Sequence, residues 1–225
     1  MGDIRTVEVK RNVLAANDEK ADAFRAARAE EGTFFVDVMA SPGAGKTTLL
    51  LALIRELRNL GVRDLGVIEA DLESDVDALK IKEAQVDAVE LNTRGVCHVE
   101  MGMVERAFAA FGRRDYEYLF LENIGNLVCP AEFDTGAHCR VMLLSVPEGW
   151  DKVMKYPPMF AAVEALIVTK SDYLPVNPDF DMEALVQHAR VLNPELEIFV
   201  TSARTGEGVA ELASWLAGRR ERELL

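Results

Sequence analysis

The segment SPGAGKTT, which starts at Ser41, combines the residue types that bind phosphate groups. Gly43 and Gly45 allow the backbone to curl so that its N–H groups point inward, and the helix that begins near Thr47 adds the positive end of its dipole. In a loop of this kind the Lys46 ammonium reaches the β- and γ-phosphates of a nucleotide, while the Thr47 hydroxyl binds Mg²⁺. We therefore predict a nucleotide-phosphate site here rather than a simple tight turn.

Two acidic residues at the expected ends of strands are placed to hold the magnesium ion. Asp71 follows the apolar run LGVIEA, and Glu122 closes the run YLFLEN. Glu122-x-x-Gly125 occupies the place where GTPases usually carry Asp-x-x-Gly, so we expect the Gly125 N–H to turn towards a γ-phosphate. The competing interpretation of Asp71 is an N-cap for the segment after it. The phosphate motif itself departs from the Walker A pattern at its first position, where Ala40 replaces glycine.

Two later segments predict guanine as the base. TKSD, residues 169–172, and TSA, residues 201–203, each end an apolar run, and ligands of open α/β sheets bind beyond such strand ends. The Asp172 carboxylate can accept hydrogen bonds from N1–H and the exocyclic amine of guanine, a pair of donors that adenine does not offer. The stem of Lys170 is expected to lie along the base. A four-residue match also occurs in plain solvated loops, and it is the place of this one downstream of the phosphate loop that favours GTP.

The predicted nucleotide site therefore has a phosphate part, a magnesium part and a guanine part. Catalysis is assigned to Lys46 and to the three expected magnesium ligands, Thr47, Asp71 and Glu122. The residues expected to contact the nucleotide are Gly43, Ala44, Gly45, Lys46, Thr47, Thr48, Gly125, Thr169, Lys170, Asp172, Ser202 and Ala203.

A second group of residues offers donors for a softer metal ion. Cys97 and His98 follow the run VDAVELN, and Cys129 follows the next expected strand. Two thiolates and an imidazole suit Zn²⁺ or Ni²⁺, and three protein ligands leave room for exchange. Spacing alone leaves the alternative of small buried thiols open, because the paired C-x-x-C of a structural zinc site is lacking. His138 and Cys139 receive no function, and Cys139, which opens an apolar run, is expected in the core.

These motifs need a scaffold of alternating strands and helices. Apolar runs of strand length are separated by segments with helical periodicity, which predicts the P-loop NTPase class, an α/β fold with a mostly parallel, doubly wound sheet of about seven strands flanked by helices. The strands are expected at 34–40, 65–70, 86–92, 118–123, 140–146, 165–170 and 196–202, and the main crossover helices at 47–60, 100–111, 180–192 and 207–217.

The N-terminal part predicts one more helix, 17–31, with Asn17 and Asp18 as its cap. We expect a single domain over 1–225 with residues 1–32 as a helical extension. The least regular segments are expected at 123–138 and 147–158, which are rich in Gly, Pro and Asn, and long loops of α/β sheets often carry function.

Length and composition limit the classes of function. With 225 residues, of which 49% are hydrophobic and 28% charged, the chain has the composition of a folded protein with a core. Its 38 acidic and 25 basic residues give a net charge of −13, which disfavours binding to nucleic acid or anionic lipid. The first residues lack the apolar stretch of a secretory signal, and no run has the length of a membrane span. We therefore expect a cytoplasmic protein that binds neither nucleic acid nor membranes.

Several long stretches resemble the HypB family, GTPases that help to deliver nickel to [NiFe]-hydrogenase during its maturation. The likeness starts at VKRNVLAAND and covers nearly the whole chain, and it is most specific in ENIGNLVCPAEFD and KYPPMF, which the related UreG proteins lack. It implies a GTP-dependent homodimer with a metal site at the interface, made by a Cys-His pair and a later Cys. These positions match Cys97, His98 and Cys129 here. Other nickel-delivery maturation proteins and the hydrogenase large subunit are the implied partners.

The chain departs from the family pattern in two places. Many members carry an N-terminal Cys motif or a His-rich stretch that binds or stores nickel, whereas residues 1–33 contain neither Cys nor His. This departure argues against a second, high-affinity nickel site. Thr169 stands where Asn is more usual, a change found in related signal-recognition GTPases, so guanine specificity should persist.

We therefore expect a homodimeric metallochaperone that hydrolyses GTP to GDP and phosphate by positioning and charge neutralisation. No side chain is identified as a catalytic base, so slow intrinsic turnover is expected. Two alternatives remain: a nucleotide-switched metal-binding scaffold with little turnover, and a small-molecule kinase with the same phosphate loop. TKSD argues against an ATP-dependent kinase, and three Cys with three His are few for metal storage.

Overall fold

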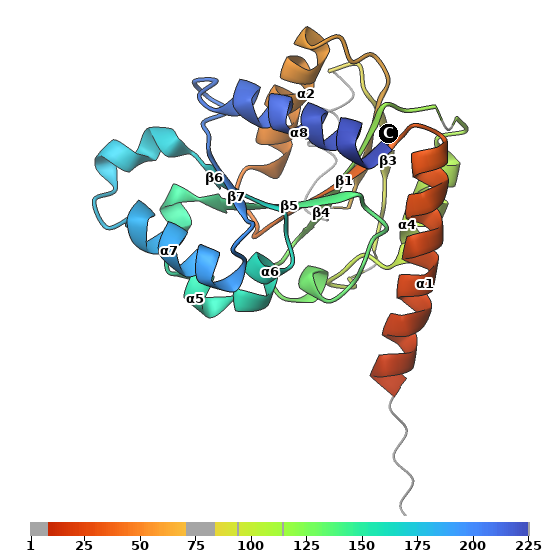
Figure 1. Cartoon of the computed structure of the whole chain (residues 1–225), viewed down its shortest axis with the longest axis horizontal. Helices are drawn as coiled ribbons and strands as arrows, with labels where there is room; N and C mark the ends of the chain where they lie inside the picture. Colours follow the sequence, from red (N-terminus) through yellow and green to blue (C-terminus); the bar gives the residue numbers. More distant parts are fainter. Residues whose placement is uncertain (1–8, 71–83, 94, 114, 225) are drawn as a thin grey trace, which may run out of the picture.

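The computed structural model describes residues 9–70, 84–93, 95–113 and 115–224. Its strands form one sheet in the order β3-β2-β4-β1-β5-β6-β7, and all their pairings are parallel (Figure 1). The prediction of a mostly parallel sheet of about seven strands is confirmed. The strands are β1 (Phe34–Ala40), β2 (Leu65–Glu69), β3 (Asp87–Glu90), β4 (Tyr118–Gly125), β5 (Cys139–Ser145), β6 (Ala165–Thr169) and β7 (Glu197–Val200).

Helices cover both faces of this sheet (Figure 1). Helices α2 and α8 share one apolar cluster with β1, whose Phe34, Val36 and Val38 point towards them. On the other face, α1 and α4 pack over one cluster and α5, α6 and α7 over a second. The helices are α1 (Val9–Glu30), α2 (Lys46–Asn59), α4 (Met101–Ala110), α5 (Lys152–Lys155), α6 (Pro157–Ala161), α7 (Met182–Leu192) and α8 (Val209–Leu224).

Hydrophobic runs predicted the central strands well because those strands are buried. Every residue of β1 and β6 is buried, as expected for a parallel sheet that helices cover on both faces. Strand β4 is longer than predicted and continues to Gly125, which pairs with Ala40 after an irregularity in the register with β1. The predicted loop 123–138 is therefore partly strand, and 147–158 contains short helices.

The predicted start of the first helix is wrong. Helix α1 already includes Val9, and Asn17 lies inside it rather than at its cap. The Asn17 side chain instead binds two other segments of the chain, so its tertiary contacts override the local preference of Asn for helix ends. Helix α8 also continues beyond the predicted 217, to Leu224. Within the described residues, none of the helices has the length and apolar character needed to cross a membrane.

Candidate functional site

The loop between β1 and α2 has the shape that its glycines predicted. Gly43 and Gly45 have φ angles of 75° and 98°, in the left-handed region that favours glycine. Helix α2 begins at Lys46, and its cap residue, Gly45, has no side chain to bond the first N–H groups of the helix. These N–H groups are therefore available to an anion at the end of β1.

Gly125 allows β4 to approach this loop closely. A Cβ atom at Gly125 would lie 2.9 Å from Pro42 Cγ and 3.0 Å from Pro42 N, closer than side-chain atoms normally come. The phosphate loop and the end of β4 are thus in direct contact, where we expected Gly125 to face a γ-phosphate.

Thr47 and Glu122, two of the predicted magnesium ligands, lie together. The Thr47 hydroxyl donates to Glu122 Oε1 over 2.6 Å, and Glu122 is almost fully buried. These are hard oxygen donors of the kind that Mg²⁺ prefers, so the pair fits the ion. The third predicted ligand, Asp71, lies outside the described residues.

Glu69 is a candidate that the sequence reasoning missed. It ends β2, is 2% exposed, and lies opposite Glu122 in the register of β2 with β4. Alternation along both strands places the two carboxylates on the same face as α2 and the phosphate loop. The sequence could have indicated Glu69, because it is an acidic residue within the apolar run LGVIEA.

The two predicted guanine segments line one cavity with the phosphate loop. The cavity has a volume of about 180 Å³. Thr169 Oγ1 donates to the Ala44 carbonyl and Lys170 Nζ to the Gly43 carbonyl, each over 2.7 Å. The predicted residues around the cavity are Ala44, Gly45, Thr48, Thr169, Lys170, Asp172, Ser202 and Ala203, and Leu49, Tyr173 and Arg204 join them.

Asp172 is held as a carboxylate at the edge of this cavity. Its Oδ1 accepts a hydrogen bond from the Ser202 hydroxyl over 2.8 Å, and Arg204 lies 3.4 Å from Oδ2. The Ser202 hydrogen bond is the main cause that lowers the pKa of Asp172, with Arg204 adding to it. An ionised carboxylate is an acceptor only, which is the state that guanine recognition requires.

Cys97 and Cys129, predicted as ligands of a softer metal, meet beyond the ends of β3 and β4. Their Sγ atoms are 2.9 Å apart, and Asn126 Nδ2 donates to the Cys97 carbonyl over 3.1 Å. The contact with Cys129 raises the pKa of the Cys97 thiol, so a metal ion that binds there must displace protons.

His98 lies beside this pair. Its Nδ1 is 3.9 Å from Cys97 Sγ, its Nε2 is 3.3 Å from Glu100 Oε1, and its ring stacks on Phe133. In the part of the chain that the structure describes, no three His, Cys, Asp or Glu side chains are grouped closely enough to hold a metal ion. The structure thus brings the two thiols together, with the imidazole near but turned to Glu100.

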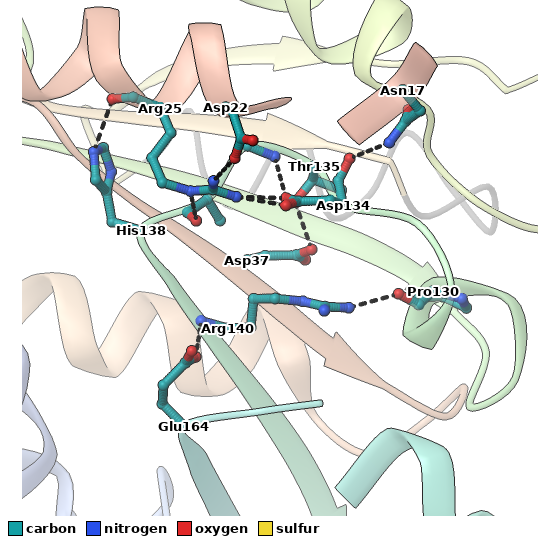
Figure 2. Close-up of polar contacts among 12 residues, drawn as sticks. Asn17, Asp22, Arg25, Asp37, Pro130, Asp134, Thr135, His138, Arg140 and Glu164 are labelled. Carbon is teal, nitrogen blue, oxygen red and sulfur yellow. Dashed lines mark hydrogen bonds and ion pairs between the residues drawn. The ribbon is translucent and has the colours of Figure 1, made fainter. Parts of the chain in front are cut away.

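A buried polar network, which the sequence did not predict, joins β1 to the loop between β4 and β5 (Figure 2). Asp37, in the middle of β1, is fully buried and accepts hydrogen bonds from Asn123 Nδ2 over 3.0 Å and from Thr135 Oγ1 over 2.8 Å. Burial raises its pKa, while the neighbouring Arg140 opposes that effect. Arg140 in turn donates to the Pro130 carbonyl over 2.8 Å, next to Cys129.

Cys139 and His138 take part in the packing and hydrogen bonding of the fold. Cys139 is completely buried in the core under α2 and α8, as expected. His138 Nδ1 accepts the Phe35 backbone N–H over 2.9 Å, and its Nε2 lies 3.1 Å from the Arg25 carbonyl. The ring therefore joins α1 to β1.

Comparison with known proteins agrees with the fold. Residues 35–200 match the family described as CobW/HypB/UreG, nucleotide-binding domain. The hydrogenase maturation factor HypB of Azotobacter chroococcum mcd 1 is 43% identical over 216 residues, 96% of this chain and 70% of that protein.

Two solved structures resemble the whole arrangement. HypB from Helicobacter pylori, determined in complex with nickel, has a TM-score of 0.86 and 33% identity over 93% of this chain and 97% of its own. HypB from Archaeoglobus fulgidus has a TM-score of 0.84 and 31% identity over 92% of this chain and 100% of its own. The sequence resemblance is confirmed, and the chain belongs to the HypB family of hydrogenase maturation factors, with a P-loop NTPase fold.

Proposed function

We propose that the chain binds GTP at the carboxyl end of its sheet and hydrolyses it. The observation that carries this proposal is the cavity in which the TKSD and TSA segments meet the phosphate loop, with the Asp172 carboxylate at its edge. Guanine would give N1–H and its amine to Asp172, whereas adenine would leave that carboxylate without the matching donors.

The hydrolysis proposed here depends on positioning. The N–H groups at the start of α2 and the Lys46 ammonium would bind the phosphate oxygens, and Thr47 with Glu122 would hold Mg²⁺, an ion that would supply positive charge against the phosphates. The close contact of Gly125 with Pro42 fixes β4 against the phosphate loop. Since no described side chain is identified as a base for the attacking water, we expect slow intrinsic turnover.

Nucleotide specificity is the first test. Affinities for GTP and ATP are measured by competition with a fluorescent GDP analogue, and phosphate release is followed for both. We expect preference for GTP by at least about two orders of magnitude, short of the about 10⁴- to 10⁵-fold of a fully buried hydrogen-bonding site because the Asp172 side chain is 15% exposed. Preference for ATP would favour the small-molecule kinase, equal affinities would contradict the guanine assignment, and GTP binding without phosphate release would favour the switched scaffold.

We propose further that the protein carries nickel to a hydrogenase, with Cys97, His98 and Cys129 as the binding residues. The H. pylori relative was solved in complex with nickel, and the two thiols here already lie in contact. Because one described copy does not group three donors, a second copy that supplies further donors would complete the site. Val128, which is 55% exposed beside Cys129, offers apolar surface for that dimer.

The metal proposal is tested by titrating Ni²⁺ and Zn²⁺ into the parent protein and two variants while the dimer fraction is followed by analytical ultracentrifugation. Cys129→Ala should lower the stoichiometry, whereas the matched control Cys139→Ala removes a buried core thiol and should not. Equal stoichiometry in the parent and Cys129→Ala would remove Cys129 from the site. Other nickel-delivery maturation proteins and the hydrogenase large subunit are the proposed recipients and partners.

A further inference from the structure

Asn17 bonds two distant segments of the chain at once. Its Nδ2 donates to the Asp134 carbonyl over 2.8 Å (Figure 2), and its Oδ1 accepts the Met101 backbone N–H over 2.9 Å. The side chain is only 8% exposed, and Met101 is completely buried. Both partners are backbone groups of fixed polarity, so the orientation of the amide is determined by its neighbours.

Each bonded segment carries part of the candidate metal site. Met101 opens α4 directly after the Cys97-His98-Val99-Glu100 stretch, and Asp134 follows Cys129 on the loop between β4 and β5. One amide group on α1 therefore joins the segment of the first thiol to the segment of the second.

The Cys129 side of this connection is reinforced by a second residue of α1. Arg25 Nη2 contacts both carboxylate oxygens of Asp134, over 2.6 and 2.8 Å, and Arg25 Nε donates to the Ala137 carbonyl over 2.9 Å (Figure 2). Helix α1 also packs through Phe24, which contacts the rings of Phe35 and Phe108. The helix is therefore a fixed support for the loop that carries Cys129.

We propose that Asn17 is a positioning residue of the metal site, which holds the Cys97–His98 segment and the Cys129 segment at the separation at which their thiols meet. This assignment rests on the proposed function for the ligand role of those residues. The position requires a donor and an acceptor on one short planar group, because one bond ends on a carbonyl and the other on an N–H. Groups that orient metal ligands from outside typically change metal affinity about 10- to 100-fold when they are removed.

The test compares Asn17→Ala and Asn17→Asp with a matched control, Phe24→Leu. Asn17→Ala removes both hydrogen bonds, and Asn17→Asp keeps the acceptor for Met101 but presents an acceptor to the Asp134 carbonyl. Phe24→Leu loosens the packing of α1 while leaving Asn17 in place. Circular dichroism and urea denaturation are used to check that each variant folds.

Two readouts are used, and the first needs no metal. Diamide oxidises the Cys97 and Cys129 thiols to a disulfide, itself taking up the two electrons and two protons, and peptide mass spectrometry gives the rate of the cross-link. The buried Cys139 serves as the internal thiol that should not react. The second readout is Ni²⁺ affinity, followed by the thiolate-to-nickel charge-transfer absorption.

We expect Asn17→Ala to slow the cross-link at least about tenfold and to weaken Ni²⁺ binding about 10- to 100-fold, with Phe24→Leu near the parent. Asn17→Asp should be impaired at least as much as Asn17→Ala, because its buried carboxylate faces the Asp134 carbonyl. A parent-like cross-link and Ni²⁺ affinity in Asn17→Ala would overturn the proposal, as would equal losses in Asn17→Ala and Phe24→Leu. If the parent itself binds no Ni²⁺ but Asn17→Ala alone slows the cross-link, Asn17 still positions the thiols, and it is the metal function that fails.

Discussion

Preferential protonation of His138 in the unfolded chain should lower the free energy of unfolding at mildly acidic pH. Burial is the main cause that lowers its pKa to about 4, and the charges of Arg25 and Arg28 act in the same direction, while the hydrogen bond to the Arg25 carbonyl and the charge of Glu223 oppose it. The structural reason is visible in the hydrogen bonds, because Nδ1 accepts the Phe35 N–H and only the neutral ring can do so. The unfolded chain, with an ordinary histidine pKa of about 6.5, takes up a proton more readily between these two values.

The sign and size follow from linkage. Because the unfolded state binds more protons between about pH 6.5 and pH 4, the free energy of unfolding decreases as the pH falls through that window and then levels off. The full shift corresponds to about 2 kcal/mol between pH 7 and pH 5. His138 keeps some contact with solvent, which screens part of the effect, so we expect about 1 kcal/mol.

The assay is urea denaturation of the parent and of His138→Asn at pH 7 and pH 5. Asn does not titrate, and its Oδ1 can still accept the Phe35 N–H. Other titrating groups are shared by both proteins, so they cancel in the comparison. The parent should lose about 1 kcal/mol more than the variant when the pH is lowered. Equal losses in the two proteins would show that His138 does not titrate as its surroundings indicate.

Three further predictions concern the nucleotide site. Lys46 is 4% exposed, so Lys46→Met, which keeps the stem and removes the charge, should abolish GTP hydrolysis with the fold intact; parent-like phosphate release would exclude the phosphate-loop assignment. Asp172→Asn should lower GTP affinity about 10-fold or more and favour XTP, which carries an oxygen in place of the guanine amine; unchanged binding of both nucleotides contradicts the base assignment. Gly125→Ala should lower the free energy of unfolding by about 1–3 kcal/mol and weaken GTP binding, because the new Cβ meets Pro42. Calorimetry with and without GDP checks this, and a parent-like unfolding temperature would count against that contact.

Local sequence was sufficient to predict those elements whose structure is determined by their own residues. The apolar runs predicted the strands because a parallel sheet buried on both faces needs continuous hydrophobic residues. The strands in turn place their carboxyl ends at one edge of the sheet, so Thr169 and Ser202 meet the phosphate loop although they are far from it along the chain.

The roles of residues whose partners lie on distant elements could not be predicted from local sequence. Asn17 carries a local signal for a helix cap, and only the packing of α1 against α4 and the β4–β5 loop shows that its amide is used there. Glu69 required the register of β2 with β4, because the register decides which carboxylates face the phosphate loop. Asp37 received no role from the sequence, because its partners Asn123 and Thr135 lie far from it along the chain.

The two candidate sites are connected through strand β4. Glu122 and Asn123 are neighbours in β4, and alternation sends their side chains to opposite faces of the sheet. Glu122 accepts the Thr47 hydroxyl on the nucleotide side, whereas Asn123 donates to Asp37 on the side of α1. Asp37 holds Thr135, whose neighbour Asp134 is bonded by Asn17. A displacement of β4 at one site must therefore move the support of the other, and if such a displacement couples GTP and nickel, each ligand must change the affinity of the other by the same factor.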